Sequence, residues 1–274
     1  MNQLAGQHEL LAAAAPGPDL CVEFFGLPGS GKSTIAREVH AILSRREPAM
    51  VFAPALLRDE AFVALRVAAK LRLVLSEASR GGTGTWTWTE AVRRTMAIRQ
   101  PRFRDRLRAS FTMATVGALY AAIRRRRLGA VLDQGMLQAL WSVRLRLTQD
   151  AGFAGLAAGL LKEAAASPRF HIAVETPQAV CAERLAARVS KHSRLQESGT
   201  AADAGLWQNA ERLRQTILHD LRAAYRLQGI PNQIITVDGT TDPVEAARRI
   251  AATILQIKLA QVLPRSTPTQ GMSA

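Results

Sequence analysis

The chain has 274 residues and a formal net charge of +14, from 36 Lys and Arg against 22 Asp and Glu. Hydrophobic residues make up 48% of it, enough to bury a core, which excludes a chain that is disordered throughout. The longest uncharged apolar run, residues 109–123, is shorter than the roughly 20 residues of a membrane-crossing helix. The N-terminus lacks the basic segment of a secretory signal. We therefore expect a folded, cytoplasmic protein without a membrane span, and the positive charge favours anionic partners such as phosphates.

Short apolar segments alternate with helical patterns along the chain, which is typical of a parallel sheet flanked by helices. We predict an α/β, three-layer fold with a five-stranded parallel sheet and helices on both faces. The domain is expected over residues 19–263, between mobile tails at residues 1–18 and 264–274. A helical insertion, residues 54–128, is predicted between the second and third strands. The predicted strands are Leu20–Phe25, Met50–Ala53, Gly129–Asp133, Phe170–Glu175 and Gln233–Asp238.

Two helix starts carry clear local signals. Thr176 followed by Pro177 predicts a helix over residues 177–189, with the Thr176 hydroxyl as its cap and proline in its first turn. The residues Thr241-Asp242-Pro243 predict the start of the last helix in a similar way.

Residues 26–33 read GLPGSGKS and match the phosphate-binding pattern G-x-x-x-x-G-K-[ST] between a predicted strand and a helical pattern. The glycines let backbone N–H groups turn onto phosphates, and the helix adds its positive N-terminal end. In this pattern Lys32 reaches the terminal phosphates and the Ser33 hydroxyl binds magnesium. We therefore predict ATP and Mg²⁺ as cofactors. The predicted nucleotide-binding residues are Gly26, Leu27, Pro28, Gly29, Ser30, Gly31, Lys32, Ser33 and Thr34.

The third predicted strand ends in an acid, Asp133, before Gln134 and Gly135. Ligands of an open parallel sheet lie outside the carboxyl ends of the strands, so Asp133 should face the same crevice as Lys32. There its carboxylate can orient magnesium, together with Ser33, or accept the proton of an attacking hydroxyl. We therefore predict Lys32 and Asp133 as catalytic residues. The alternative is that Asp133 only caps the following helix.

Four landmarks appear in the order found in nucleoside and nucleotide monophosphate kinases: GLPGSGKS, LDQG, VETPQAVCAERLAARVSKHSR and IITVDGTTDP. The chain resembles that P-loop kinase family, and within it most closely the thymidylate kinase and deoxynucleoside kinase branch. The resemblance implies a P-loop NTPase fold and ATP-dependent phosphoryl transfer to a small-molecule acceptor. At Gln134 the family often has an arginine, so the acceptor stays open.

The resemblance also implies a closing lid over residues 184–200, whose arginines stack on the adenine or clamp the transferring phosphoryl group. Arg184 and Arg188 are four residues apart and share one face of the predicted helix. Arg184 is expected to bind the nucleotide, and Arg188 and Arg194 to act in catalysis. Which of the latter two contacts the γ-phosphate stays open, and the alternative is a solvated basic helix end.

The acceptor is expected in the insertion, where many arginines could receive an acidic group and two tryptophans could stack on a base or sugar. The alternative is that the tryptophans belong to the core and the arginines face solvent. Four consecutive arginines from Arg124 could equally cover a helix C-terminus. The candidate substrate-binding residues are Arg58, Trp86, Trp88, Arg93 and Gln134.

The sequence leaves other functions open. A nucleotide-dependent binding or regulatory module with slow ATP hydrolysis is one alternative, and a P-loop kinase acting on a saccharide or an antibiotic is another. Nucleic acid is a less favoured partner, because aromatic residues are only 5% of the chain and are not interleaved with the basic ones. The protein could also form a homodimer.

Overall fold

The computed structural model describes residues 20–53, 63–80, 85–98, 102–145, 147, 152–166, 169–188 and 202–262. These residues form a five-stranded sheet in the order β2-β3-β1-β4-β5, and every neighbouring pair is parallel. This confirms the predicted fold class and the number and positions of the strands. The strands are β1 Cys21–Phe25, β2 Val51–Phe52, β3 Ala130–Leu132, β4 Arg169–Glu175 and β5 Ile234–Asp238.

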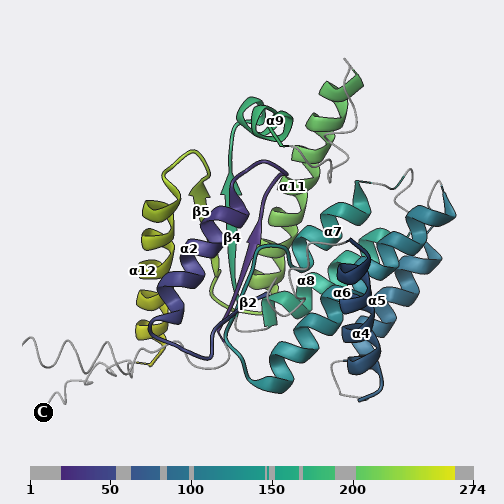
Figure 1. Cartoon of the computed structure of the whole chain (residues 1–274), viewed down its shortest axis with the longest axis horizontal. Coiled ribbons are helices and arrows are strands. Elements are labelled where there is room, and N and C mark those ends of the chain that lie inside the picture. The colour runs from purple at the N-terminus through teal and green to yellow at the C-terminus, as the bar shows by residue number, and fades with distance from the viewer. Residues whose placement is uncertain are drawn as a thin grey trace, which may run out of the picture.

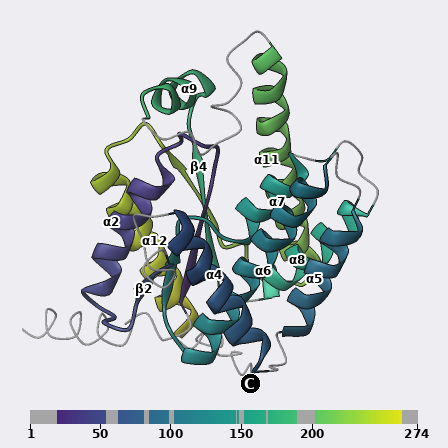
Figure 2. The same cartoon turned by 45° about the vertical axis from the view of Figure 1, so that its right-hand side comes forward.

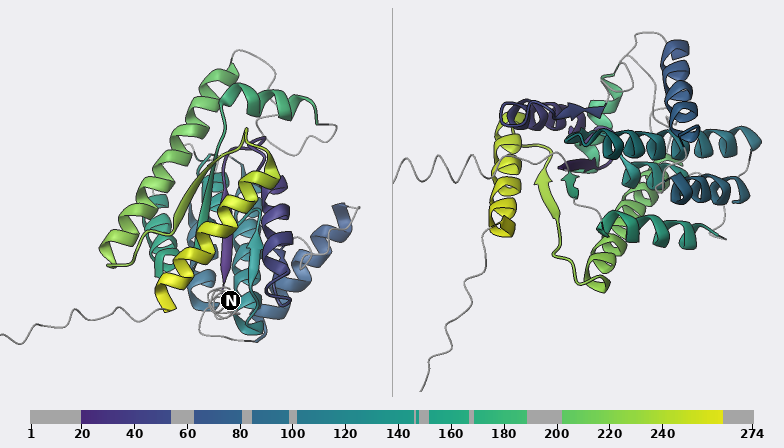
Figure 3. Two further views of the ribbon diagram at one scale, coloured as in Figure 1. Left: turned by 90° about the vertical axis from the view of Figure 1, so that its left-hand side faces the viewer. Right: turned by 90° about the horizontal axis from the view of Figure 1, so that it is seen from below.

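Both faces of the sheet are covered by helices, which is why its strands read as nearly continuous apolar runs. On one face, α2 (Lys32–Ser44) and α12 (Pro243–Val262) pack on side chains such as Val22 and Phe24 (Figure 1). The other face is covered by a larger helical layer (Figure 3). Its main helices are α6 (Phe103–Arg126), α7 (Met136–Arg144), α8 (Phe153–Ala166) and α11 (Ala202–Leu227).

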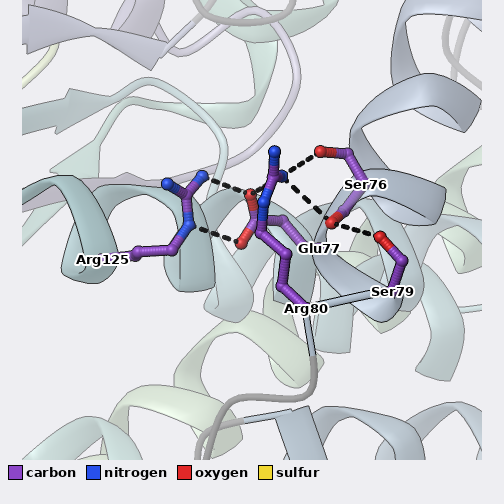
Figure 4. A network of polar contacts seen from close by, with 5 residues as sticks. All are labelled: Ser76, Glu77, Ser79, Arg80 and Arg125. Carbon is purple, nitrogen blue, oxygen red and sulfur yellow. Dashed lines mark hydrogen bonds and ion pairs between the residues drawn. The ribbon is translucent and has the colours of Figure 1, made fainter.

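The described part of the predicted insertion is helical. Between β2 and β3 lie α4 (Val63–Ala78), α5 (Thr85–Ala97) and α6, on the same side of the sheet as α7 and α8 (Figure 2). An ion pair joins α4 to α6, with Arg125 Nη2 donating to Glu77 Oε1 over 2.6 Å (Figure 4). Arg80, on the turn after α4, contacts the same carboxylate.

The start of the helix after β4 differs from the prediction. In α9 (Gln178–Ala186) the N-cap residue is Pro177, and no side chain caps the helix. The Thr176 hydroxyl donates instead to the Ser30 carbonyl over 3.0 Å, because the phosphate-binding loop lies close to the end of β4. The predicted cap at Thr176 is therefore wrong, and this hydroxyl joins the end of β4 to the phosphate-binding loop.

Two other helix-end predictions agree with the structure. Asp242 Oδ1 accepts the N–H groups of Val244 and Glu245, each over 3.0 Å, and caps α12. Arg124 lies in the last turn of α6, with the arginines that follow it, where the helix dipole favours cations. None of the helices in the described ranges combines the length and apolar character needed to cross a membrane. The two predicted tails fall outside these ranges.

Candidate functional site

The phosphate-binding loop connects β1 to α2 at the carboxyl end of the sheet. Gly29 and Gly31 have φ angles of +85° and +89°, a left-handed conformation that favours glycine. A Cβ atom at Gly29 would lie 2.4 Å from the carbonyl oxygen of Cys181, because α9 packs against the loop. Gly31 is the N-cap of α2, with no side chain bonded to the helix end. The positive end of α2 therefore remains available to an anion.

Lys32 extends into this loop. Its side chain is buried, and Nζ donates to the carbonyl oxygen of Leu27 over 3.1 Å. Burial lowers the pKa of Lys32 to about 8; the nearby Asp133 carboxylate opposes this shift, and the positive charge of Arg188 adds to it. Lys32 is thus mostly protonated at neutral pH and holds a positive charge inside the loop. This is the arrangement that a triphosphate requires.

The Ser33 hydroxyl donates to Asp133 Oδ2 over 3.1 Å. The contact joins the first turn of α2 to the end of β3, which are brought together because β3 pairs directly with β1. Asp133 does not cap α7: the N-cap of that helix is Gly135, and no hydrogen bond runs from Asp133 to the helix end. The capping alternative is therefore wrong, and the carboxylate is directed toward the loop.

Ser33 and Asp133 together form a donor set that fits Mg²⁺. Both offer oxygen atoms, the ligands that Mg²⁺ prefers. Protein sites for Mg²⁺ commonly use one or two such side chains, and water and phosphate oxygens complete the coordination. The close approach of the hydroxyl and the carboxylate is what this pairing requires.

A second glycine-dependent contact supports the loop from the far side of β4. A Cβ atom at Gly239 would lie 2.2 Å from both the Ser30 carbonyl oxygen and Thr176 Oγ1. The carbonyl of Gly239 accepts a 2.9 Å hydrogen bond from Arg184 Nη1, and that nitrogen would also lie 3.3 Å from a Cβ atom at Gly31. The turn after β5 and the arginine of α9 therefore border the loop.

The predicted lid is only partly described. Arg188 is exposed just beyond α9, and its charge lowers the pKa of Lys32, so it lies within electrostatic range of the phosphate site. Arg184 lies beside the loop, as described above. Arg194 and the rest of the segment 189–201 are outside the described residues.

The candidate acceptor residues have different surroundings. Trp88 is 4% exposed, and its ring stacks on Tyr120 with the centroids 5.8 Å apart, so it is a core residue and not an open stacking surface. Its predicted role as a substrate contact is corrected accordingly. Arg93 is exposed and pairs with Glu90 on its own helix over 2.6 Å. Gln134 is exposed next to Asp133. Arg58 and the side chain of Trp86 are outside the described residues.

Sequence reasoning missed Gly239, which borders the loop, and Glu23, a buried acid in β1. Gly239 stands in the IITVDGTTDP segment directly after β5, and this position was the available signal. Glu23 is a charged residue in the middle of an apolar strand. An acid at such a position was itself a signal, since buried carboxylates require partners.

The fold and the loop define a P-loop nucleotide-binding protein of the kinase-like class. A family model described as an AAA domain matches residues 22–215, from β1 into α11. The chain therefore belongs to this family. The family is part of a larger group of P-loop NTPase-like kinases, and many of its members are P-loop kinases. The match does not extend to the thymidylate kinase-like branch. No curated protein matches the chain.

Proposed function

We propose that the protein is a kinase that uses ATP and Mg²⁺ to transfer a phosphoryl group to a small-molecule acceptor. The observation that carries the proposal is the hydrogen bond between Ser33 Oγ and Asp133 Oδ2, beside the buried ammonium group of Lys32. In P-loop NTPases the loop Ser or Thr and an acid at a neighbouring strand end hold Mg²⁺ together. In a kinase an acid at this point can also orient the acceptor hydroxyl or accept its proton.

Each group then has a defined task. The backbone of residues 26–33 and the N-terminus of α2 bind the triphosphate, and Lys32 neutralises its terminal groups. Ser33 and Asp133 would hold Mg²⁺, which would neutralise negative charge on the phosphates when bound. Asp133 also orients the acceptor hydroxyl or accepts its proton. Positioning and electrostatics supply most of such catalysis, so this small set is sufficient.

The arginines of the lid act on the other side of the nucleotide. Arg184 donates to the Gly239 carbonyl beside the loop, which supports its proposed role in binding the nucleotide. Arg188 and Arg194 close over the transferring phosphoryl group in this proposal. Such closure excludes water and strengthens the interaction between the cations and the phosphate.

For the acceptor we propose a nucleoside or a nucleoside monophosphate. The support is the order of the four sequence landmarks, which is that of the nucleoside and nucleotide kinases, including the thymidylate kinase-like branch. A second acceptor class is favoured by one residue. Gln134 is exposed beside Asp133, where that family often has an arginine, and a neutral amide suits the hydroxyl groups of a saccharide or an antibiotic.

The test measures ADP formation from Mg-ATP with nucleosides, nucleoside monophosphates, sugars and aminoglycosides, and with no acceptor. An increase that depends on one acceptor class, and that Lys32→Ala abolishes, is the expected result and names the substrate class. Tight ATP binding without stimulation by any acceptor would contradict the proposal and favour the regulatory module.

The role of Asp133 is tested separately with Asp133→Asn. We expect turnover to fall by about 100-fold or more, because an amide neither accepts a proton nor neutralises a cation. ATP binding without Mg²⁺ should be retained. The matched control is Asp220→Asn, which removes an exposed carboxylate from α11 and should leave turnover unchanged. Wild-type turnover in Asp133→Asn would remove Asp133 from the mechanism.

A further inference from the structure

Glu23 is a fully buried acid in the middle of β1, the strand that leads into the phosphate-binding loop. Its neighbours Cys21 and Phe25 belong to the core cluster beneath α6 and α7, and the strand alternation places Glu23 on that same face. Burying a carboxylate costs free energy unless it is hydrogen-bonded or paired. The contacts of Glu23 therefore indicate why the fold keeps it there.

Both carboxylate oxygens of Glu23 accept short hydrogen bonds. Oε1 accepts the backbone N–H of Leu137 over 2.7 Å, and Oε2 accepts the hydroxyl of Tyr120 over 2.6 Å. The guanidinium of Arg169, itself buried, lies 4.0 Å from the centroid of the Tyr120 ring and contributes a compensating positive charge. The carboxylate thus links β1 to α6 and α7.

The bond to Leu137 acts at the first turn of α7. Leu137 is the second residue of this helix, and helix N-termini leave four N–H groups without intrahelical partners. The N-cap, Gly135, has no side chain that could bond them. Glu23 supplies the missing acceptor from a different element.

The turn that carries Asp133 lies directly on this carboxylate. Glu23 pairs in register with Leu132, the residue before Asp133. A Cβ atom at Gly135 would lie 2.4 Å from Glu23 Cδ, so the backbone of the turn is in close contact with the acid. Asp133 is therefore held between two attachments to Glu23, the strand pairing on one side and the Leu137 bond on the other.

We propose that Glu23, oriented by the Tyr120 hydroxyl, is a positioning residue for Asp133. By anchoring the start of α7 it fixes the turn 133–135 and directs the Asp133 carboxylate toward Ser33. The inference rests on the proposed function, because it concerns the Mg²⁺-binding pair of that site. It assigns a task to a buried acid that contacts neither the phosphate loop nor the acceptor.

The test compares Glu23→Leu, which removes both hydrogen-bond acceptors, with Tyr120→Phe, which removes only the hydroxyl that orients Glu23. The affinity for a non-hydrolysable ATP analogue is measured while Mg²⁺ is added. The quantity compared is the Mg²⁺ concentration at which half of the increase in affinity is reached. We expect it to rise by about 10-fold in both variants, the usual effect of removing a residue that orients a metal ligand. The affinity for the analogue in EDTA should be unchanged, since Lys32 and the loop are intact.

Tyr225→Phe is the matched control. Its hydroxyl bonds His171 and the Arg169 carbonyl in the same buried region, but it has no bond to α7. Thermal unfolding of all three variants should shift by a few degrees, and only Glu23→Leu and Tyr120→Phe should change the Mg²⁺ dependence. Lower stability with an unchanged Mg²⁺ dependence in those two variants would overturn the inference.

Asp133→Asn, measured in parallel, separates the two proposals. If Asp133→Asn raises the Mg²⁺ concentration required and Glu23→Leu does not, the inference fails and the proposed function stands. If Asp133→Asn itself has no effect, the Mg²⁺ role of Asp133 fails and the positioning role falls with it.

Discussion

The phosphate-binding end of the sheet and the helical insertion between β2 and β3 use their charges differently. At the sheet, Lys32 is buried, and Ser33 and Asp133 meet from elements 100 residues apart in sequence. In the insertion, the side chains of Arg93 and Arg94 are 69% and 47% exposed and both pair with Glu90 on their own helix. Exposed pairs of this kind contribute little to stability, because solvent screens their charges. A functional site is therefore indicated by charges that converge from separate elements, and not by a high density of charge.

The largest expected effect is at Lys32. Lys32→Ala should lower turnover by about 100- to 1,000-fold, because it removes the buried cation that neutralises the terminal phosphates. Arg94→Ala is the control from the insertion and should change turnover by less than about twofold, since its guanidinium pairs only on the surface. Steady-state ADP formation measures both. Similar losses of turnover in the two variants would contradict the difference drawn here between the phosphate-binding end of the sheet and the insertion.

An intermediate effect is expected at Gly239. In Gly239→Ala the new methyl group would collide with the Ser30 carbonyl and the Thr176 hydroxyl, so we expect a loss of about 1–3 kcal/mol of stability. Nucleotide affinity should fall as well, because the collision displaces the loop. Gly159→Ala is the matched control: in α8 a Cβ atom meets nothing within 4 Å, and the change should stabilise the helix by about 0.5–1 kcal/mol. Chemical denaturation measures whether each variant is less or more stable than the wild type. Equal changes in stability in the two variants would contradict the packing argument.

The smallest effect concerns the buried histidine behind Glu23. Burial and the charge of Arg169 lower the pKa of His171 to about 3, so His171 is neutral although Glu23 lies 3.8 Å away. Its other neighbour is the Tyr225 hydroxyl, at 3.0 Å. In the unfolded chain a histidine has a pKa near 6.5, so between pH 6.5 and 3 the unfolded state binds the additional proton. Stability should therefore fall as the pH decreases through this window, by at most about 1.4 kcal/mol per pH unit.

Denaturation at pH 7 and pH 5 measures this effect. Between these two pH values, the free energy of unfolding of His171→Gln should decrease by about 1–2 kcal/mol less than that of the wild type, since glutamine does not titrate. Carboxylates elsewhere titrate equally in both proteins, and the difference isolates His171. Parallel pH dependences in the two proteins would show that His171 does not stay neutral in the folded state.

Local patterns predicted those parts of the protein that depend on neighbouring residues. The five strands lie within two residues of their predicted ends because buried parallel strands are short, continuous apolar runs. Gly29 and Gly31 were found because a tight loop requires left-handed backbone angles that favour glycine. Asp133 was found because the carboxyl ends of parallel strands share one edge of the sheet.

The errors concern side chains whose partners are distant in sequence. Thr176 has the local pattern of a helix cap, but its hydroxyl bonds Ser30, 146 residues away. Trp88 could have been a stacking surface or a core residue, and only its packing on Tyr120 decides between them. Spacing along the chain gives no information about such contacts.

By itself the sequence determined the fold class, the phosphate-binding loop and the acid at the end of β3, since each is encoded in a short run of residues with local geometry. Only the tertiary structure decided how Asp133 is used, because its contact with Ser33 depends on the pairing of β3 with β1. The same holds for Glu23, whose partners come from α6 and α7. A buried acid takes its role from whichever donors the fold brings to it, and these are fixed by packing over the whole chain.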